Sequence, residues 1–164
     1  MQQNIDGSLY FNQSWETFKF GFGIRTCNYW LGNELIHQLT KDGQYKLRFD
    51  VQAEIDGKWY WAEYSTFVVD SEETKYYMNV SGYSGNAGDA MTRHNPTTFT
   101  TFDSDNDEMH LNCANNRGGG FWWKACGYAQ ITGSRLAHHF GFTWRKLPLN
   151  DTHLLKSRAW LMCP

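Results

Sequence analysis

One segment in the middle of the chain carries the strongest chemical signal. Residues 99–113 read FTTFDSDNDEMHLNC, and four of the six residues from Asp103 to Glu108 are carboxylates. In an extended segment, residues i and i+2 point to the same side, so Asp105 and Asp107 can converge on one cation. Calcium accepts about six to eight oxygen ligands in loose geometry, whereas magnesium requires stricter octahedral geometry. The segment therefore predicts a calcium site.

Two other interpretations of this acidic segment differ in their chemistry. An EF-hand loop needs Gly at its sixth position and Glu at its twelfth, and a loop that starts at Asp103 has Glu108 and Ala114 there. This excludes an EF-hand. A solvated acidic turn without a metal stays open as an alternative. Repulsion between unneutralised carboxylates would open such a turn, which favours the metal.

The cysteines suggest a covalent brace next to the acidic segment. Cys113 and Cys126 enclose twelve residues, and closing a loop of this size stabilises a fold by about 3 kcal/mol in the chain-entropy treatment. Four cysteines allow three connectivities, and there is no C-x-x-C pair typical of a zinc site. We favour a Cys113–Cys126 disulfide. A second bond between Cys27 and Cys163, two free thiols, and pairing with another segment all stay open.

Composition limits the class of protein. The chain has 164 residues, of which 41% are hydrophobic and 20% charged, and its net charge is -2. These values are typical of one globular domain and argue against a general nucleic-acid binder, which needs a strongly basic surface. No apolar run approaches the roughly 20 residues that span a bilayer. Aromatic residues make up 17% and include eight Trp, which indicates packing under irregular backbone, with a sugar-stacking surface as the alternative.

Local patterns predict an α+β fold with an antiparallel sheet and short side helices. The expected elements are a short helix between Ser14 and Gly21, a helix at 33–39 that Asn33 could cap, and strands at 45–51, 58–64 and 76–80. Asp56-Gly57 is a hairpin signal between the first two strands. After Ser81 the regular patterns fade, so this loop-rich half needs a disulfide or an ion for its stability.

Three tripeptides match the acceptor pattern for N-glycosylation, at Asn12, Asn79 and Asn150. Together with a disulfide and a calcium loop they favour an extracellular location. The polar start, Met1 to Ser8, contains no recognisable signal peptide.

Several motifs in order along the chain resemble the globular fibrinogen C-terminal (fibrinogen-related) domain. They are 4–8 (NIDGS), 30–34 (WLGNE), 64–67 (YSTF), 82–91 (GYSGNAGDAM), 99–107 (FTTFDSDND), 112–114 (NCA), 120–123 (GFWW) and Cys126. The resemblance implies a secreted, single α+β domain over residues 1–164, with a calcium-binding, loop-rich half. That family normally opens with another subdomain, so we expect an N-terminally truncated domain, and oligomerisation would depend on a region outside this chain.

The resemblance also assigns site residues. It makes Asp105 and Asp107 the side-chain ligands of Ca2+, and Met109 and Leu111 its backbone-carbonyl ligands. It places the disulfide of the family on Cys113 and Cys126, below the ligand pocket, and a cis peptide at Ala125–Cys126.

The pocket departs from the lectin-like members, ficolins and tachylectins, which hold acetylated sugars between aromatic residues and a His. The position of that His is Gly127 here, and an aromatic position of the slot is Arg117. The groups expected to bind a ligand are Arg117, Lys124, Tyr128, His138, His139 and Trp144. Arg117 and Lys124 favour an acidic ligand.

Two functions follow from these expectations. The first is a calcium-stabilised recognition module that binds glycans, acetylated or acidic, or extracellular proteins, in a lectin-like innate-immune or adhesion role. The alternative is a structural extracellular-matrix or assembly domain without a small-ligand pocket. We expect no enzymatic activity, because no nucleophile and base stand at a motif spacing.

Overall fold

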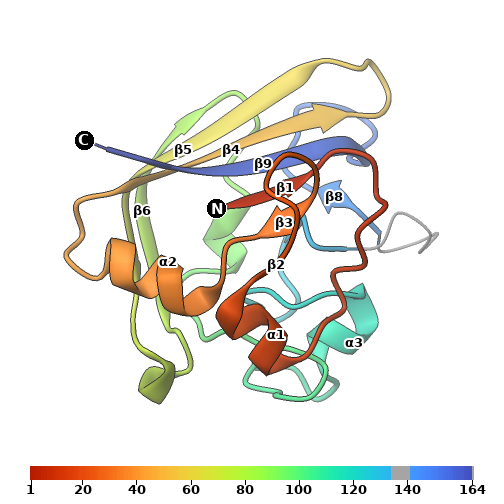
Figure 1. Ribbon diagram of the computed structural model, residues 1–164. Helices are drawn as coiled ribbons and strands as arrows, with labels where there is room; N and C mark the ends of the chain where they lie inside the picture. Colours follow the sequence, from red (N-terminus) through yellow and green to blue (C-terminus); the bar gives the residue numbers. More distant parts are fainter. Residues whose placement is uncertain (134–140, 164) are drawn as a thin grey trace.

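A seven-stranded antiparallel sheet organises the chain in the computed structural model, which describes residues 1–133 and 141–163 (Figure 1). In chain order the strands are β1 (Gln2–Asn4), β2 (Phe22–Gly23), β3 (Tyr29–Trp30), β4 (Lys46–Ala53), β5 (Trp59–Val69), β6 (Met78–Gly85) and β9 (Leu154–Met162). Their spatial order is β2-β3-β1-β9-β4-β5-β6. A separate antiparallel pair joins β7 (Ala129–Gln130) to β8 (Thr143–Trp144).

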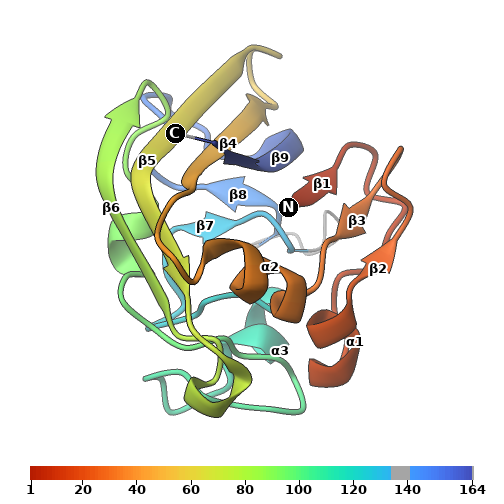
Figure 2. The ribbon, with the colours of Figure 1, turned by 60° about the vertical axis from the view of Figure 1, so that its left-hand side comes forward.

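Short helices accompany the sheet, as the predicted α+β class requires. They are α1 (Trp15–Phe20), α2 (Asn33–Thr40) and α3 (Cys113–Arg117), with single 3-10 turns at η1 (Glu72–Thr74) and η2 (Met91–Arg93). Figure 2 shows α3 and its neighbouring loops at the end of the molecule opposite the turn between β4 and β5. None of the helices in the described ranges is long and apolar enough to cross a membrane.

The ends of α1 follow from its sequence. The hydroxyl of Ser14 accepts a hydrogen bond from Thr17 N at 3.3 Å, and Gly21 N donates to Thr17 O at 2.9 Å. Gly21 has a φ of +87°, and a Cβ there would lie 2.6 Å from the carbonyl oxygen of Leu31. A glycine is therefore required at the end of α1, and the expected helix is confirmed.

The second helix is present, but the expected cap was wrong. Gly32 precedes α2 as its cap residue and makes no side-chain hydrogen bond, while Asn33 is the first residue inside the helix. The Asn33 side chain instead accepts a hydrogen bond from Trp30 Nε1 at 2.9 Å. The buried Nε1 of Trp30 needs a hydrogen-bond acceptor. Because Asn33 Oδ1 accepts this bond, it does not cap the start of the helix.

Strands β4, β5 and β6 confirm the three expected strands, although each begins one or two residues later than predicted and continues past the predicted end. Strand β9 was not predicted. It lies between β1 and β4, where Arg158 pairs with Gln3 on one side and Asp50 on the other. Its sequence alternates poorly, because only Leu154, Ser157 and Ala159 of its nine residues are buried.

Aromatic side chains fill the core between the sheet and the loop-rich half. Phe18, Trp30, Phe99 and Trp122 contact one another with ring centroids 5.1 to 5.8 Å apart. Such offset and edge-to-face pairs add about 0.5–1.5 kcal/mol each to the burial of their area. Four tryptophans are fully buried, Trp30, Trp122, Trp123 and Trp144. They confirm that much of the Trp content is packing.

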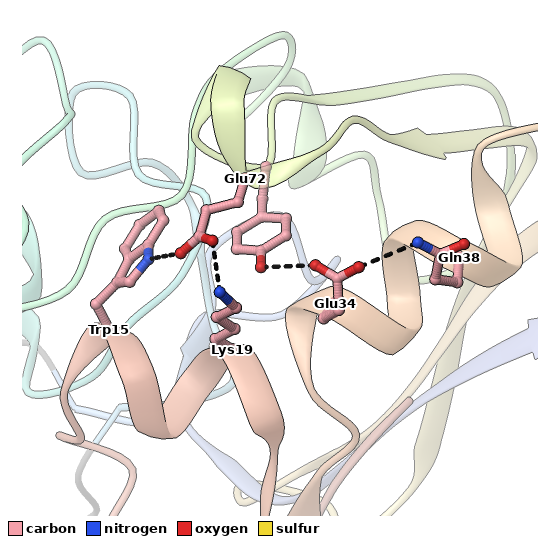
Figure 3. Close-up of polar contacts among 6 residues, drawn as sticks. Trp15, Lys19, Glu34, Gln38 and Glu72 are labelled. Carbon is pink, nitrogen blue, oxygen red and sulfur yellow. Dashed lines mark hydrogen bonds and ion pairs between the residues drawn. The ribbon is translucent and has the colours of Figure 1, made fainter.

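A polar network fastens α1 to η1 and α2 to Tyr76, two residues after η1 (Figure 3). Glu72 accepts hydrogen bonds from Trp15 Nε1 at 2.8 Å and from Lys19 Nζ at 2.6 Å. Next to it, the Tyr76 hydroxyl donates to Glu34 at 3.1 Å, and the ring of Tyr76 stacks on Trp15 at 5.6 Å. The hydrogen bond from Lys19 is the main cause that lowers the pKa of Glu72.

Candidate functional site

A disulfide bond between Cys113 and Cys126 braces the loop-rich half. Its sulfur atoms are 2.12 Å apart and its Cα atoms 5.2 Å apart. Cys113 begins α3, and the side chain of Asn112 caps this helix by accepting a hydrogen bond from Asn115 N at 3.0 Å. The favoured pairing is confirmed, and the other two cysteines, Cys27 and Cys163, are free thiols.

The four carboxylates of the acidic segment have different partners in the structure. Asp103 accepts hydrogen bonds from Trp15 N at 2.9 Å and from the Thr101 hydroxyl at 2.7 Å, so it belongs to the start of α1. Glu108 turns to Lys124, with 3.7 Å between the charged atoms. Asp105 and Asp107 remain as the pair that can meet a cation.

Asp107 lies at the centre of this segment. Its two oxygens accept hydrogen bonds from Met109 N and from Cys113 N, both at 2.8 Å, which connects the acidic segment directly to the disulfide. Asp105 is close enough to accept a longer bond from Asp107 N at 3.4 Å. Burial is the main cause that raises the pKa of Asp107, and the nearby charge of Asp105 adds to it.

Asn106, between the two aspartates, anchors the acidic segment to the residues before it. Its amide nitrogen donates to Phe99 O at 2.9 Å and to Ser104 O at 3.2 Å, and its backbone N–H donates to the Thr100 hydroxyl at 3.1 Å. The Asn106 side chain thus holds the segment to Phe99 and Ser104, and none of these bonds uses the carboxylate of Asp105 or Asp107.

The donor set agrees with calcium rather than with zinc. Within residues 1–133 and 141–163, no three His, Cys, Asp or Glu side chains come together as a metal-binding group. The acidic segment offers two carboxylates, so the other ligands of an ion would be backbone carbonyls and water. Calcium accepts such neutral oxygens, whereas structural zinc sites use Cys and His. The repulsion between Asp105 and Asp107 is a reason for a cation to bind there.

A pocket of about 260 Å³ opens beside the disulfide. It is lined by Thr92, Arg93, Glu108, Lys124 and Ala125. Two of the five lining residues are cations and one is an anion, which already pairs with Lys124. The predicted ligand residue Lys124 therefore lies in a pocket, together with Arg93, which the sequence analysis missed.

Tyr128 extends this basic surface. The guanidinium of Arg93 lies 5.5 Å from the centre of the Tyr128 ring, and the ammonium of Lys146 lies 4.8 Å from it. Cations over a tyrosine ring are attracted by its negative face. The ring thus gathers two basic side chains from distant parts of the chain, and neither of them stands in a motif that could have revealed it.

His94 supports the backbone behind the pocket. It is fully buried, its Nε2 accepts hydrogen bonds from Tyr128 N at 2.9 Å and Ala129 N at 2.8 Å, and its Nδ1 donates to Trp122 O at 2.7 Å. Only the neutral ring with the proton on Nδ1 can make all three bonds. Burial lowers the pKa of His94 to about 4.

Gly127 fits against this imidazole. Its φ is +70°, and a Cβ at this position would lie 2.1 Å from Cε1 of His94. The expected position of the acetyl-binding His therefore has no room for any side chain while His94 keeps its place.

The other expected ligand residues have different fates. Trp144 is fully buried, and its Nε1 donates to Ala87 O and Gly88 O, both at 3.1 Å, so its assignment as a ligand residue is corrected to core packing. Arg117 ends α3 and is half-buried, and burial and the charge of Arg145 lower its pKa. His138 and His139 lie outside the described residues.

The expected cis peptide at Ala125–Cys126 was also wrong. Among the described residues, the cis peptide bond is Asn95–Pro96. Cys126 instead turns the chain with a φ of +60°. This left-handed residue and Gly127 after it direct the backbone toward His94.

Comparison with known proteins decides the family. Residues 1–156 match the family described as "Fibrinogen beta and gamma chains, C-terminal globular domain". The chain belongs to the fibrinogen C-terminal domain family. Domains of this family are recognition modules and not enzymes, which confirms the expectation for this fibrinogen-like domain.

Curated relatives include several fibrinogen-like proteins. "Fibrinogen-like protein A" of Apostichopus parvimensis is 37% identical over 135 residues, which cover 80% of this chain and 48% of that protein. "Angiopoietin-related protein 2" of Homo sapiens is 43% identical over 126 residues, which cover 77% of this chain and 25% of that protein. "Ryncolin-4" of Cerberus rynchops is 38% identical over 133 residues, which cover 80% of this chain and 38% of that protein. The fibrinogen-like domain thus spans between 25% and 48% of these relatives.

Solved structures share the fold over nearly the whole chain. The fibrinogen-like globe domain of human ANGPTL2 matches with a TM-score of 0.91 and 36% identity, covering 99% of this chain and 78% of that one. A lamprey fibrin D-dimer, complexed with the peptide Gly-His-Arg-Pro-amide, matches with a TM-score of 0.89 and 26% identity. The match covers 98% of this chain and 59% of that one.

Proposed function

We propose that this fibrinogen-like domain is an extracellular recognition module. Its ligand site is the pocket of Arg93 and Lys124 beside the Cys113–Cys126 disulfide, and the ligand is an acidic group of a glycan or of a protein. The observation that supports this most directly is the meeting of Arg93, Lys124 and Lys146 around Tyr128 and the pocket. An extracellular location agrees with the disulfide and with relatives named tenascin and angiopoietin.

Calcium is the second part of the proposal. Asp105 and Asp107 would hold the ion, with backbone carbonyls of Met109 and Leu111 completing the ligands. The ion would neutralise the acidic segment and hold it against Cys113, because Asp107 already accepts a hydrogen bond from Cys113 N. The ion would therefore act on recognition indirectly, because it would order the loop that carries Glu108, and Glu108 lines the pocket.

The pocket disfavours a cationic ligand. The lamprey fibrin fragment was solved with a peptide that contains His and Arg. In the present domain Arg93 and Lys124 would repel such a peptide, and the one lining carboxylate, Glu108, is paired with Lys124. An acidic ligand gains from both cations, so we expect sialylated or sulfated sugars, or a carboxylate-rich peptide, to bind better than neutral acetylated sugars.

A glycan screen with and without a chelator tests the ligand part. We expect acidic glycans to bind in millimolar calcium, and Arg93→Ala or Lys124→Ala to weaken binding by about tenfold. Lys41→Ala is the matched control, because Lys41 is exposed at the end of α2, where its Nζ donates a hydrogen bond to Gln38 Oε1 at 3.1 Å. If no glycan in the screen binds while the domain still adheres to matrix proteins, the result would instead support an assembly domain without a small-ligand pocket.

The calcium part has its own test. Thermal unfolding should show a higher Tm with calcium, and Asp105→Asn, alone or with Asp107→Asn, should remove that increase. Asp103→Asn is the control, because Asp103 serves the start of α1 and should leave the calcium response intact. An unchanged response of the Asp105→Asn and Asp107→Asn double variant would refute the assignment.

A further inference from the structure

The outer face of the sheet carries an unusual set of side chains. On β4, residues 47, 49, 51 and 53 are buried, so 46, 48, 50 and 52 point to the other side. The pairing places their neighbours on β9 and β5 on the same side. We call this surface the outer face; its members are Lys46, Arg48, Asp50, Gln52, Trp59, Trp61, Glu63, Lys156, Arg158, Trp160 and Met162.

No helix of the described chain covers this face. Helices α1, α2 and α3 lie below β4, β5 and β9 in both views (Figures 1 and 2). Trp59 and Trp160 accordingly remain 42% and 40% exposed. Trp and Arg, which this face combines, are the residue types enriched among the residues that contribute most to binding.

The tryptophans are held in place before any ligand arrives. The guanidinium of Arg48 lies 4.9 Å from the ring centre of Trp61, and that of Arg158 lies 5.1 Å from the ring centre of Trp59. Trp160 Nε1 donates to Asp50 Oδ2 at 2.7 Å. Fixed rings lose little conformational entropy on binding, which favours affinity.

The charge of the outer face is positive, although the whole chain carries -2. Its two carboxylates, Asp50 and Glu63, both contact Arg48, at 2.9 and 3.7 Å. Asp50 has its second oxygen taken by Trp160. Lys156 and Arg158 therefore make no ion pair among the described residues, and Arg158 Nε is buried without a hydrogen-bond partner.

We infer that the outer face binds an extended acidic polysaccharide, with sugar rings stacked on Trp59 and Trp160 and acid groups at Lys156 and Arg158. Trp160 lies opposite Arg48 and Trp59 opposite Gln52, on the two neighbours of β4. Ordinary strand spacing then separates the Cα atoms of the two tryptophans by about 16 Å. An extended chain of several sugars can contact both rings. This surface is separate from the disulfide pocket and needs no calcium.

The test uses a heparin-derived decasaccharide and its desulfated form as probes, with affinity measured by surface plasmon resonance. We expect the sulfated chain to bind, and Trp59→Ala with Trp160→Ala to weaken it about tenfold. Lys156→Glu should weaken it similarly without a folding risk, since Lys156 makes no ion pair. In the Arg93→Ala and Lys124→Ala double variant with a chelator, where the proposed pocket no longer contributes, the sulfated chain should still bind and the outer-face substitutions should still weaken it, which separates this inference from the proposed pocket.

Four results would overturn the inference. Three of them are equal binding of the desulfated chain, wild-type affinity of both outer-face variants, and loss of binding in the pocket variant alone. A poly-glutamate peptide that binds as tightly as the decasaccharide, with no effect of the Trp substitutions, would assign the face to acidic proteins and also reject it. Circular dichroism of each variant confirms that the sheet is intact before affinities are compared.

Discussion

At Gly127 the backbone packs against the imidazole of His94. A substitution there has two effects that can be measured separately, the steric clash with His94 and the strain of a positive φ. Gly127→Ala introduces a methyl group 2.1 Å from Cε1 of His94 and also strains a φ of +70°. Gly57→Ala is a matched control, because Gly57 has a φ of +67° and no atom within 4 Å of the added Cβ. We expect about 1 kcal/mol of destabilisation at Gly57 and at least about 2 kcal/mol more at Gly127.

Denaturant unfolding of both variants measures this difference. Equal losses at the two positions would mean that His94 moves aside at no cost. The same contact predicts that Gly127→His yields an unstable protein and no acetylated-sugar site, because the new side chain would need the space that His94 fills.

The buried His94 makes stability depend on pH. Its pKa is about 4 in the folded protein and 6.5 when exposed, so the unfolded chain takes up a proton first as the solution is acidified. The contribution of His94 is complete above pH 6.5, falls between pH 6.5 and 4, and is lost below that range. The loss amounts to about 3 kcal/mol in the free energy of unfolding. Unfolding curves across this range should show it.

A variant without a titrating ring isolates this effect. His94→Gln should be less stable at neutral pH, and the part of the pH slope between 6.5 and 4 that His94 causes should disappear. A variant that keeps the full wild-type slope would place the titrating group elsewhere.

At the scale of elements, the acidic segment supports α1 as well as the proposed ion. Asp103 accepts a hydrogen bond from Trp15 N, one of the unsatisfied donors at the start of α1. We expect Asp103→Ala to destabilise the protein by about 1 kcal/mol and to leave the calcium-induced change in Tm intact. Loss of the calcium response in this variant would mean that all the carboxylates act as one unit.

Elements whose signals are local could be predicted from the sequence. Ser14 and Gly21 determine the ends of α1 through their hydrogen bonds with Thr17. The acidic segment could be recognised from the spacing of its carboxylates within six residues. Strand β9 could not be predicted, because its burial depends on β1 and β4, which lie far away in the sequence. Arg93 was missed for the same reason, since only the path of the folded chain brings it to Lys124. Trp144 was misassigned because a tryptophan serves equally well in a core and on a sugar.

At the scale of the whole molecule, one disulfide stabilises a half with little regular structure. Cys113→Ala with Cys126→Ala should lower the free energy of unfolding by about 3 kcal/mol. Cys27→Ser with Cys163→Ser should change it little, because both of these thiols are free and not buried. Thiol titration of the denatured protein should find two reactive groups before reduction and four after it. Four groups without reduction would contradict the Cys113–Cys126 bond.

The central place of β9 has a consequence for synthesis. This strand leaves the ribosome after all the other strands, yet it separates β1 from β4 in the finished sheet. A nascent chain that has made β1 to β6 therefore holds two sheet fragments with an open gap between them, each exposing unpaired backbone N–H and C=O groups. Ribosome-bound intermediates of this domain should consequently recruit chaperones until residues 154–162 emerge.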